Sequence, residues 1–154
     1  MNGTITAKPS FVEIMVKKIF VDSDVLIDVF AVRRPFYDDS ARFLGLAEEH
    51  RCEAFTSPLV VANISYVLQK FSNRKTALGC IQKVRTFMGI VDMNEAVVDR
   101  ALLSFISDFE DALQIYSAEG AEMDWIVTRN LGHYKKSPLS VLSPTEAISV
   151  LNQS

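Results

Sequence analysis

The stretch KIFVDSDVLID, residues 18–28, decides the fold. Its first residues form a short β-prone run that ends at Asp22, and the pattern at 25–31 predicts a short helix. Packing explains a carboxylate at such a strand end poorly. Asp22 could hold a divalent metal or act as a nucleophile. The alternative is that Asp22 or Ser23 only caps the following helix, and the stretch alone leaves the two interpretations equally open.

Short apolar runs alternate with longer amphipathic runs along the rest of the chain. Strands are predicted at 18–21, 53–56, 125–128 and 141–142, and a strand or an extended link at 90–93. Longer helices are predicted at 37–50, 57–71, 73–88, 94–104, 108–119 and 143–153. Gly89 is expected to end the helix over 73–88, and residues 129–138 to form a loop. Strands that alternate with helices predict an α/β fold, in which a central parallel sheet has helices on both faces. Functional side chains gather at the carboxyl ends of the strands in such sheets.

Length and composition indicate one globular domain. The chain has 154 residues, 49% of them hydrophobic, which suffices for one core. Residues 1–14 are interpreted as an N-terminal extension, either frayed or an upstream start, and residues 15–154 as the domain. The net charge of −3 argues against nucleic-acid binding by bulk charge. Local basic clusters or metal ions held by acids would have to make any such contact.

Two features predict a cytoplasmic protein without a membrane anchor. No apolar run reaches the roughly 18 residues that span a bilayer. The first residues, MNGTITAKPSF, lack the basic region followed by an apolar one that is typical of a secretory signal.

Two further motifs carry polar groups. In DFEDALQ, Asp108 and Asp111 share one face of a helix, although Asp108 also suits the role of N-cap. In DWIVTRN, an apolar strand delivers Thr128 and Asn130 to its carboxyl end, although a polar turn would look the same. If Asp22, Asp111 and Asn130 meet at one sheet edge, their repulsion would be relieved by a divalent cation. Hard oxygen ligands favour Mg²⁺ or Mn²⁺, which activate water for phosphodiester hydrolysis.

These motifs, in this order, resemble the PIN-domain family, which includes VapC-like toxins of toxin–antitoxin pairs. The resemblance rests on VDSDVLID, SPLVVANISYVL, DFEDALQ and the ending IVTRN–HY–SPLSVLSPTEAI, and it covers roughly residues 16–151. It implies a PIN-like three-layer α/β/α domain and a Mg²⁺- or Mn²⁺-dependent endoribonuclease. Asp22 and Asp111 would be the metal ligands, and Asp108 and Asn130 would join them in catalysis.

The resemblance also implies supporting residues and partners. The supporting residues would be Thr128, Asn63, His133 and Ser23. Arg129, Lys135 and Lys136 could meet substrate phosphates. The partners would be RNA, a cognate antitoxin protein that covers the site, and a second copy of the chain in a homodimer. The apolar faces of 60–71 and 77–88 could serve such contacts.

The sequence departs from the family pattern at two positions. Relatives usually have Glu where Asn63 stands and Asp where His133 stands. An amide and an imidazole bind a hard metal less well than carboxylates do. An alternative is therefore a catalytically weakened PIN domain that acts as an RNA- or protein-binding module.

A haloacid-dehalogenase-like phosphatase is a third interpretation. Its opening motif is also a strand followed by Asp-x-Asp, with Asp22 as nucleophile and Asp24 as acid and base. Against it, the chain contains no Gly-Asp dipeptide, and Glu110-Asp111 falls within a predicted helix and not after a strand.

Overall fold

The computed structural model describes residues 16–153, so the predicted extension at 1–14 lies outside the described residues. Five parallel strands form one sheet in the order β3-β2-β1-β4-β5. They are β1 (Lys18–Val21), β2 (Glu53–Thr56), β3 (Met88–Ile90), β4 (Trp125–Val127) and β5 (Ser140–Leu142).

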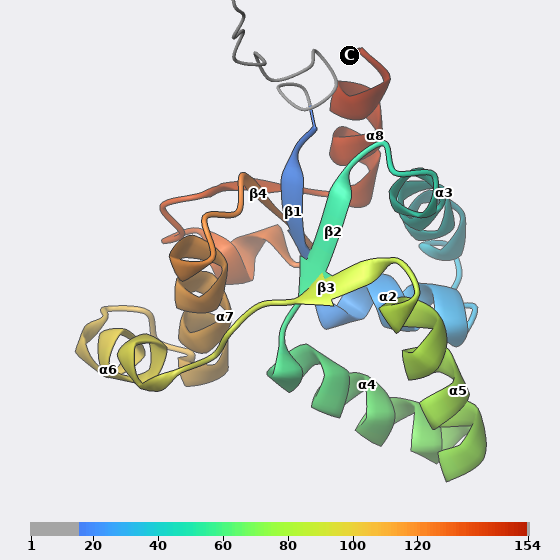
Figure 1. The fold of residues 1–154 in the computed structure, drawn as a ribbon, viewed down its shortest axis with the longest axis horizontal. Coiled ribbons are helices and arrows are strands. Elements are labelled where there is room, and N and C mark those ends of the chain that lie inside the picture. The colour runs from blue at the N-terminus through green and yellow to red at the C-terminus, as the bar shows by residue number, and fades with distance from the viewer. Residues whose placement is uncertain (1–15, 154) are drawn as a thin grey trace, which may run out of the picture.

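Helices cover both faces of this sheet (Figure 1). In Figure 1, α6 and α7 lie on one side, and α2, α3 and α8 lie on the other. The described helices are α2 (Ser23–Phe30), α3 (Tyr37–Glu48), α4 (Pro58–Phe71), α5 (Arg74–Arg85), α6 (Glu95–Leu103), α7 (Phe109–Gly120), α8 (Pro144–Asn152) and a short 3₁₀ helix, η1 (Leu131–Tyr134). The predicted three-layer α/β/α architecture is therefore confirmed.

Local sequence signals set most helix starts. A Ser, Asn or Asp side chain accepts a hydrogen bond from a first-turn backbone N–H of six helices, as Ser57 does at α4 and Asn73 at α5. At α8, Ser143 and Glu146 form a reciprocal capping box. These bonds satisfy N–H groups that otherwise have no partner within the helix.

The core lies on both faces of the central strand. Ile19, Phe20 and Val21 of β1 are fully buried, as are Ile126 and Val127 of β4. A strand that is covered by helices on both faces has no solvated side, which explains why β1 is a continuous apolar run and not an alternating one.

The prediction for residues 73–93 was partly wrong. Helix α5 ends at Arg85, and Met88–Ile90 forms β3, so Gly89 lies within a strand and does not end the helix. Gly89 pairs with Phe55 of β2, and a Cβ at Gly89 would lie 2.6 Å from two Phe55 ring carbons. The absence of a side chain thus makes room for a cross-strand ring, a contact that local sequence does not reveal. The predicted loop at 129–138 likewise contains η1.

The strand order places a topological switch point between β1 and β4. The chain leaves β1 toward β2 on one side, whereas β4 pairs with β1 on the other. In parallel sheets, ligands bind outside the carboxyl ends of the strands at such a switch point. The backbone N–H of Asp22 donates to Val127 O at 3.0 Å, so the ends of β1 and β4 meet there.

Candidate functional site

Asp22 lies at the carboxyl end of β1 and caps α2. Its Oδ1 accepts a hydrogen bond from the Ser23 N–H at 2.7 Å, and its Oδ2 accepts one from the Thr128 hydroxyl at 2.9 Å. The residue is only 8% exposed. The capping role is therefore present, but capping uses one oxygen only, and the other belongs to a contact between β1 and β4.

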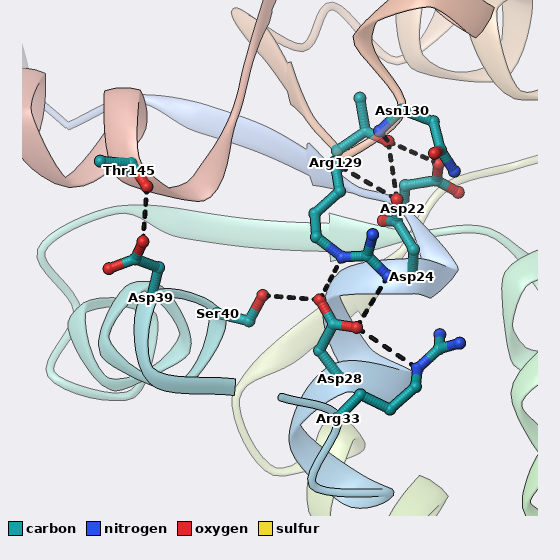
Figure 2. Close-up of polar contacts among 10 residues, drawn as sticks. Asp22, Asp24, Asp28, Arg33, Asp39, Ser40, Arg129, Asn130 and Thr145 are labelled. Atoms are coloured by element: carbon teal, nitrogen blue, oxygen red, sulfur yellow. Dashed lines mark hydrogen bonds and ion pairs between the residues drawn. The ribbon is translucent and has the colours of Figure 1, made fainter. Parts of the chain in front are cut away.

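Asp24 is a second buried acid at this position, which the metal-site prediction omitted. Its Oδ2 accepts hydrogen bonds from the Arg129 N–H at 3.0 Å and from the Thr128 hydroxyl at 3.2 Å (Figure 2). Its Oδ1 is buried without a hydrogen-bond partner within residues 16–153. The Asp-x-Asp spacing was the available signal, and only the phosphatase interpretation had used it.

The two carboxylates compete for one proton donor. A hydroxyl has a single hydrogen, yet the Thr128 hydroxyl lies within hydrogen-bonding distance of both Asp22 and Asp24. Burial raises the pKa of Asp22, partly offset by hydrogen bonds from Ser23, Thr128 and Tyr134. Burial and then the charge of Asp22 raise the pKa of Asp24 to about 6. The pair is therefore short of positive charge, and a proton or a cation would relieve it.

Asp111 brings a third carboxylate to the site from α7. Its backbone N–H donates to Asp108 Oδ1 at 2.9 Å, so Asp108 caps α7 as its position allowed. The Asp111 side chain is 17% exposed, and His133 Nδ1 lies 3.6 Å from Asp111 Oδ2. Burial and the neighbouring Asp108 raise the pKa of Asp111 to about 6, while His133 opposes the rise and the charge of Asp22 adds to it. The carboxylates of Asp22 and Asp111 are therefore close enough to interact electrostatically.

Asn63 contacts a carboxylate in place of supplying one. Its Nδ2 donates to Glu110 Oε1 at 2.7 Å, which joins α4 to the first turn of α7. The charge of Glu110 contributes to the raised pKa of Asp22 and of Asp111. Glu110 is therefore a further acid near the site. The sequence interpretation had missed this role because Glu110 reads as an ordinary first-turn acid.

The residues expected to meet phosphates lie in two different settings. Arg129 donates to both oxygens of Asp28 (Figure 2). Its guanidinium also stacks 3.8 Å from the centroid of the Phe36 ring, so this side chain has protein partners. Lys136 Nζ donates to the carbonyl of Phe105 at 2.8 Å. Lys135, Lys136 and His133 line a hollow of about 140 Å³ beside η1.

Asn130 supports the site through its backbone. Its N–H donates to Thr128 Oγ1 at 3.0 Å, which leaves the Thr128 hydrogen free to face Asp22 and Asp24. Its side chain makes no capping hydrogen bond to η1.

The acids fit one mode of magnesium binding. Within residues 16–153, no three His, Cys, Asp or Glu side chains stand close enough to hold one ion together. Mg²⁺ commonly keeps several waters and takes only one or two protein carboxylates, with substrate phosphates completing its shell. The carboxylates of Asp22 and Asp111, whose pKa values are both raised, suit that mode. No described helix combines the length and the apolar character that a membrane span requires.

Comparison with known proteins gives consistent matches. Residues 18–132, well over half of the chain, match the family described as "PIN domain". A curated relative, Ribonuclease VapC1 of Aquifex aeolicus (strain VF5), is 27% identical over 135 residues, which cover 84% of this chain and 92% of that protein.

Solved structures share the fold at low identity. A toxin–antitoxin complex from Klebsiella pneumoniae contains a chain that is 17% identical, with a TM-score of 0.63 over 82% of this chain and 97% of that one. VapBC-1 from nontypeable Haemophilus influenzae contains one that is 12% identical, with a TM-score of 0.62 over 83% and 98%. The family match also removes the haloacid-dehalogenase alternative. The switch-point acids and the match over residues 18–132 together show that the chain belongs to the PIN domain family.

Proposed function

We propose that this chain is a Mg²⁺- or Mn²⁺-dependent endoribonuclease and the toxin of a toxin–antitoxin pair that acts in the cytoplasm. The observation that carries the proposal is that two buried carboxylates, Asp22 and Asp24, share one hydrogen-bond donor, the Thr128 hydroxyl. Asp111 is close enough to interact electrostatically with Asp22. The name of the Aquifex relative, a ribonuclease, supports RNA as the substrate.

Asp22 and Asp111 would hold the metal. When bound there, a divalent ion supplies Lewis-acid stabilisation of a phosphate and a water of lowered pKa. Thr128 and Ser23 hold the Asp22 carboxylate by its two oxygens, so its orientation is set before any ion arrives. Asp108 fixes the first turn of α7 and with it the backbone of Asp111.

The basic hollow beside η1 would take the RNA backbone. Lys135 and Lys136 lie there with His133, and His133 also reaches Asp111. Phosphate contacts from these side chains would place the strand next to the acids without selecting its sequence. The Arg129 guanidinium is less available for such a phosphate contact, because it is hydrogen-bonded to Asp28.

Partners follow from the same relatives. Structural neighbours include a toxin–antitoxin complex and VapBC-1, so we infer a cognate antitoxin for this chain. We infer a homodimer as well, from the family resemblance alone. Exposed apolar side chains on α4, Tyr66 and Phe71, are available for one of these contacts.

The decisive experiment is cleavage of a mixed RNA pool by purified protein with Mn²⁺, Mg²⁺ or a chelator. Asp22→Ala removes the central acid, and Asp99→Asn, an exposed acid on α6, is the matched control. Metal-dependent cleavage that is lost in Asp22→Ala and kept in Asp99→Asn supports the nuclease. If folded wild-type protein cleaves no more than Asp22→Ala, the proposal fails. The non-catalytic binding module, which Asn63 and His133 favour, then takes its place.

A further inference from the structure

A fully buried carboxylate, Asp28, lies one helical turn beyond Asp24 on α2. Arg129 donates to both of its oxygens, through Nε at 2.5 Å and Nη2 at 2.9 Å. Ser40 of α3 adds a hydrogen bond at 3.1 Å, and Arg33 lies 3.4 Å away as an ion pair (Figure 2). A buried charge with this many donors is fully paired, and its geometry is correspondingly restricted.

Arg129 connects this buried pair to the acid site. Its guanidinium binds Asp28, while its backbone N–H donates to Asp24 Oδ2 at 3.0 Å. Two successive turns of α2 are therefore attached to one residue, which directly follows Thr128. The side chain is only 20% exposed and is packed on the Phe36 ring, so it has little freedom to change partner.

We propose that Asp28 and Arg129 are positioning residues of the acid site, an inference that rests on the proposed metal-dependent function. Their ion pair sets the register of α2 against the end of β4. That register determines where Asp22 and Asp24 stand relative to the Thr128 hydroxyl. In this role the two side chains act through helix α2 and Asp24 and not on the substrate. Partners that orient metal-binding carboxylates typically change metal affinity 10- to 100-fold when they are removed.

The test compares two arginines that share one carboxylate. Arg129→Gln removes the guanidinium that is tied to the acid site. Arg33→Gln removes the other cation beside Asp28, whose Nε makes no hydrogen bond within the described residues. Mn²⁺ binding to each full-length protein is measured by electron paramagnetic resonance in the absence of RNA. The measured affinity therefore does not depend on any contact between Arg129 and an RNA phosphate. The melting temperature is recorded in parallel.

We expect Arg129→Gln to weaken Mn²⁺ binding roughly tenfold or more, Arg129→Lys to recover part of it, and Arg33→Gln to stay within about twofold of wild type. Equal Mn²⁺ affinity in Arg129→Gln and wild type, with only the melting temperature lowered, would make the pair purely structural and overturn the inference.

A second readout keeps the two proposals separate. Amide hydrogen exchange of the Arg129 N–H, measured by NMR on metal-free protein, reports the contact with Asp24 directly. Asp28→Asn should speed this exchange at least tenfold more than it speeds exchange of core amides in β1. If it does not, the positioning role is refuted whatever the metal result. Absence of Mn²⁺ binding in wild type, with the exchange effect present, refutes the proposed metal site and leaves the positioning role supported.

Discussion

The hydroxyl of Thr128, directly after β4, lies 2.9 Å from Asp22 Oδ2 at the end of β1. The same hydroxyl lies 3.2 Å from Asp24 Oδ2, and it accepts a hydrogen bond from the Asn130 N–H. Its one hydrogen therefore serves two buried acids that lie outside the ends of adjacent strands. This shortage of donors makes the site sensitive to protons and to cations, and it leads to the first three predictions.

Asp24→Asn should stabilise the metal-free protein at neutral pH. The pKa of Asp24 rises from 3.8 to about 6 on folding, so the folded state binds more protons between these values. The free energy of unfolding contributed by this group is largest below pH 3.8 and declines as the pH rises through about 6. Asn cannot ionise, so the variant should gain about 2–3 kcal/mol at pH 7.5 and almost nothing at pH 3.5. Denaturant unfolding in chelator at both pH values measures this, and an equal gain at both would contradict the electrostatic origin.

Mn²⁺ should stabilise the protein in a pH-dependent manner. The metal needs deprotonated carboxylates, and the pKa of Asp111 is raised to about 6. At pH 7.5, Mn²⁺ at about 100 times its dissociation constant should add about 2.7 kcal/mol to the free energy of unfolding. At pH 4.5 the same concentration should add little. Thermal melts with Mn²⁺ or chelator at the two pH values check this, with Asp22→Ala as the variant that should lose the effect.

Thr128→Val should impair both stability and cleavage. Valine keeps the shape but removes the one donor that, among residues 16–153, Asp22 and Asp24 share. The loss should cost about 1–3 kcal/mol, because it removes a hydrogen bond from the buried Asp22 carboxylate and leaves Asp24 Oδ2 with the Arg129 N–H alone. Thr86→Val is the control, since the Thr86 hydroxyl bonds only an exposed carbonyl of its own helix turn. If Thr128→Val and Thr86→Val have the same free energy of unfolding, the Thr128 hydroxyl does not stabilise the two carboxylates.

The hydrogen bond between Asn63 and Glu110 predicts that the amide and the acid can be exchanged between the two positions. Asn63 Nδ2 donates to Glu110 Oε1 at 2.7 Å, so the acid of this pair comes from α7 and the amide from α4. Glu110→Gln should lower RNA cleavage, and Asn63→Glu should lower it too, because two acids would then repel each other. The double variant Asn63→Glu/Glu110→Gln restores one acid and one amide and should recover most of the activity. If its loss equals the sum of the single losses, measured as kcat/KM, the two side chains do not act as a pair.

Gly89→Ala should destabilise the sheet. A Cβ would lie 2.6 Å from two Phe55 ring carbons, and the ring would have to shift against the core. The expected cost is about 1–3 kcal/mol. Gly79→Ala is the matched control, because nothing lies within 4 Å of a Cβ at this helical position. That change should stabilise by roughly 0.5–1 kcal/mol through helix propensity, and urea unfolding of both variants separates the two signs.

Much of the fold was predictable from local patterns. The apolar run before Asp22 and the capping residues Ser57, Asn94 and Ser143 placed strands and helix starts within a residue or two of where they lie. These signals are short-range, since a cap contacts its own first turn and periodicity reflects one element at a time. Met88 and Gly89 were misassigned because they extend an amphipathic pattern. Only pairing with Ala54 and Phe55 of β2 makes them a strand.

By itself, the sequence determined the alternation of strands and helices, and with it a parallel sheet whose strand ends deliver Asp22 and Thr128 to one edge. Only the tertiary structure decided which side chains share that edge. Asp24 joins Asp22 because one hydroxyl from β4 reaches both, and Arg129 is withdrawn from solvent because Asp28 is buried beneath it. Glu110 stands near the acids because α4 and α7 meet at Asn63. The physical reason is that hydrogen bonds and charges act through distances of a few ångströms, and chain folding brings residues about a hundred positions apart within that range.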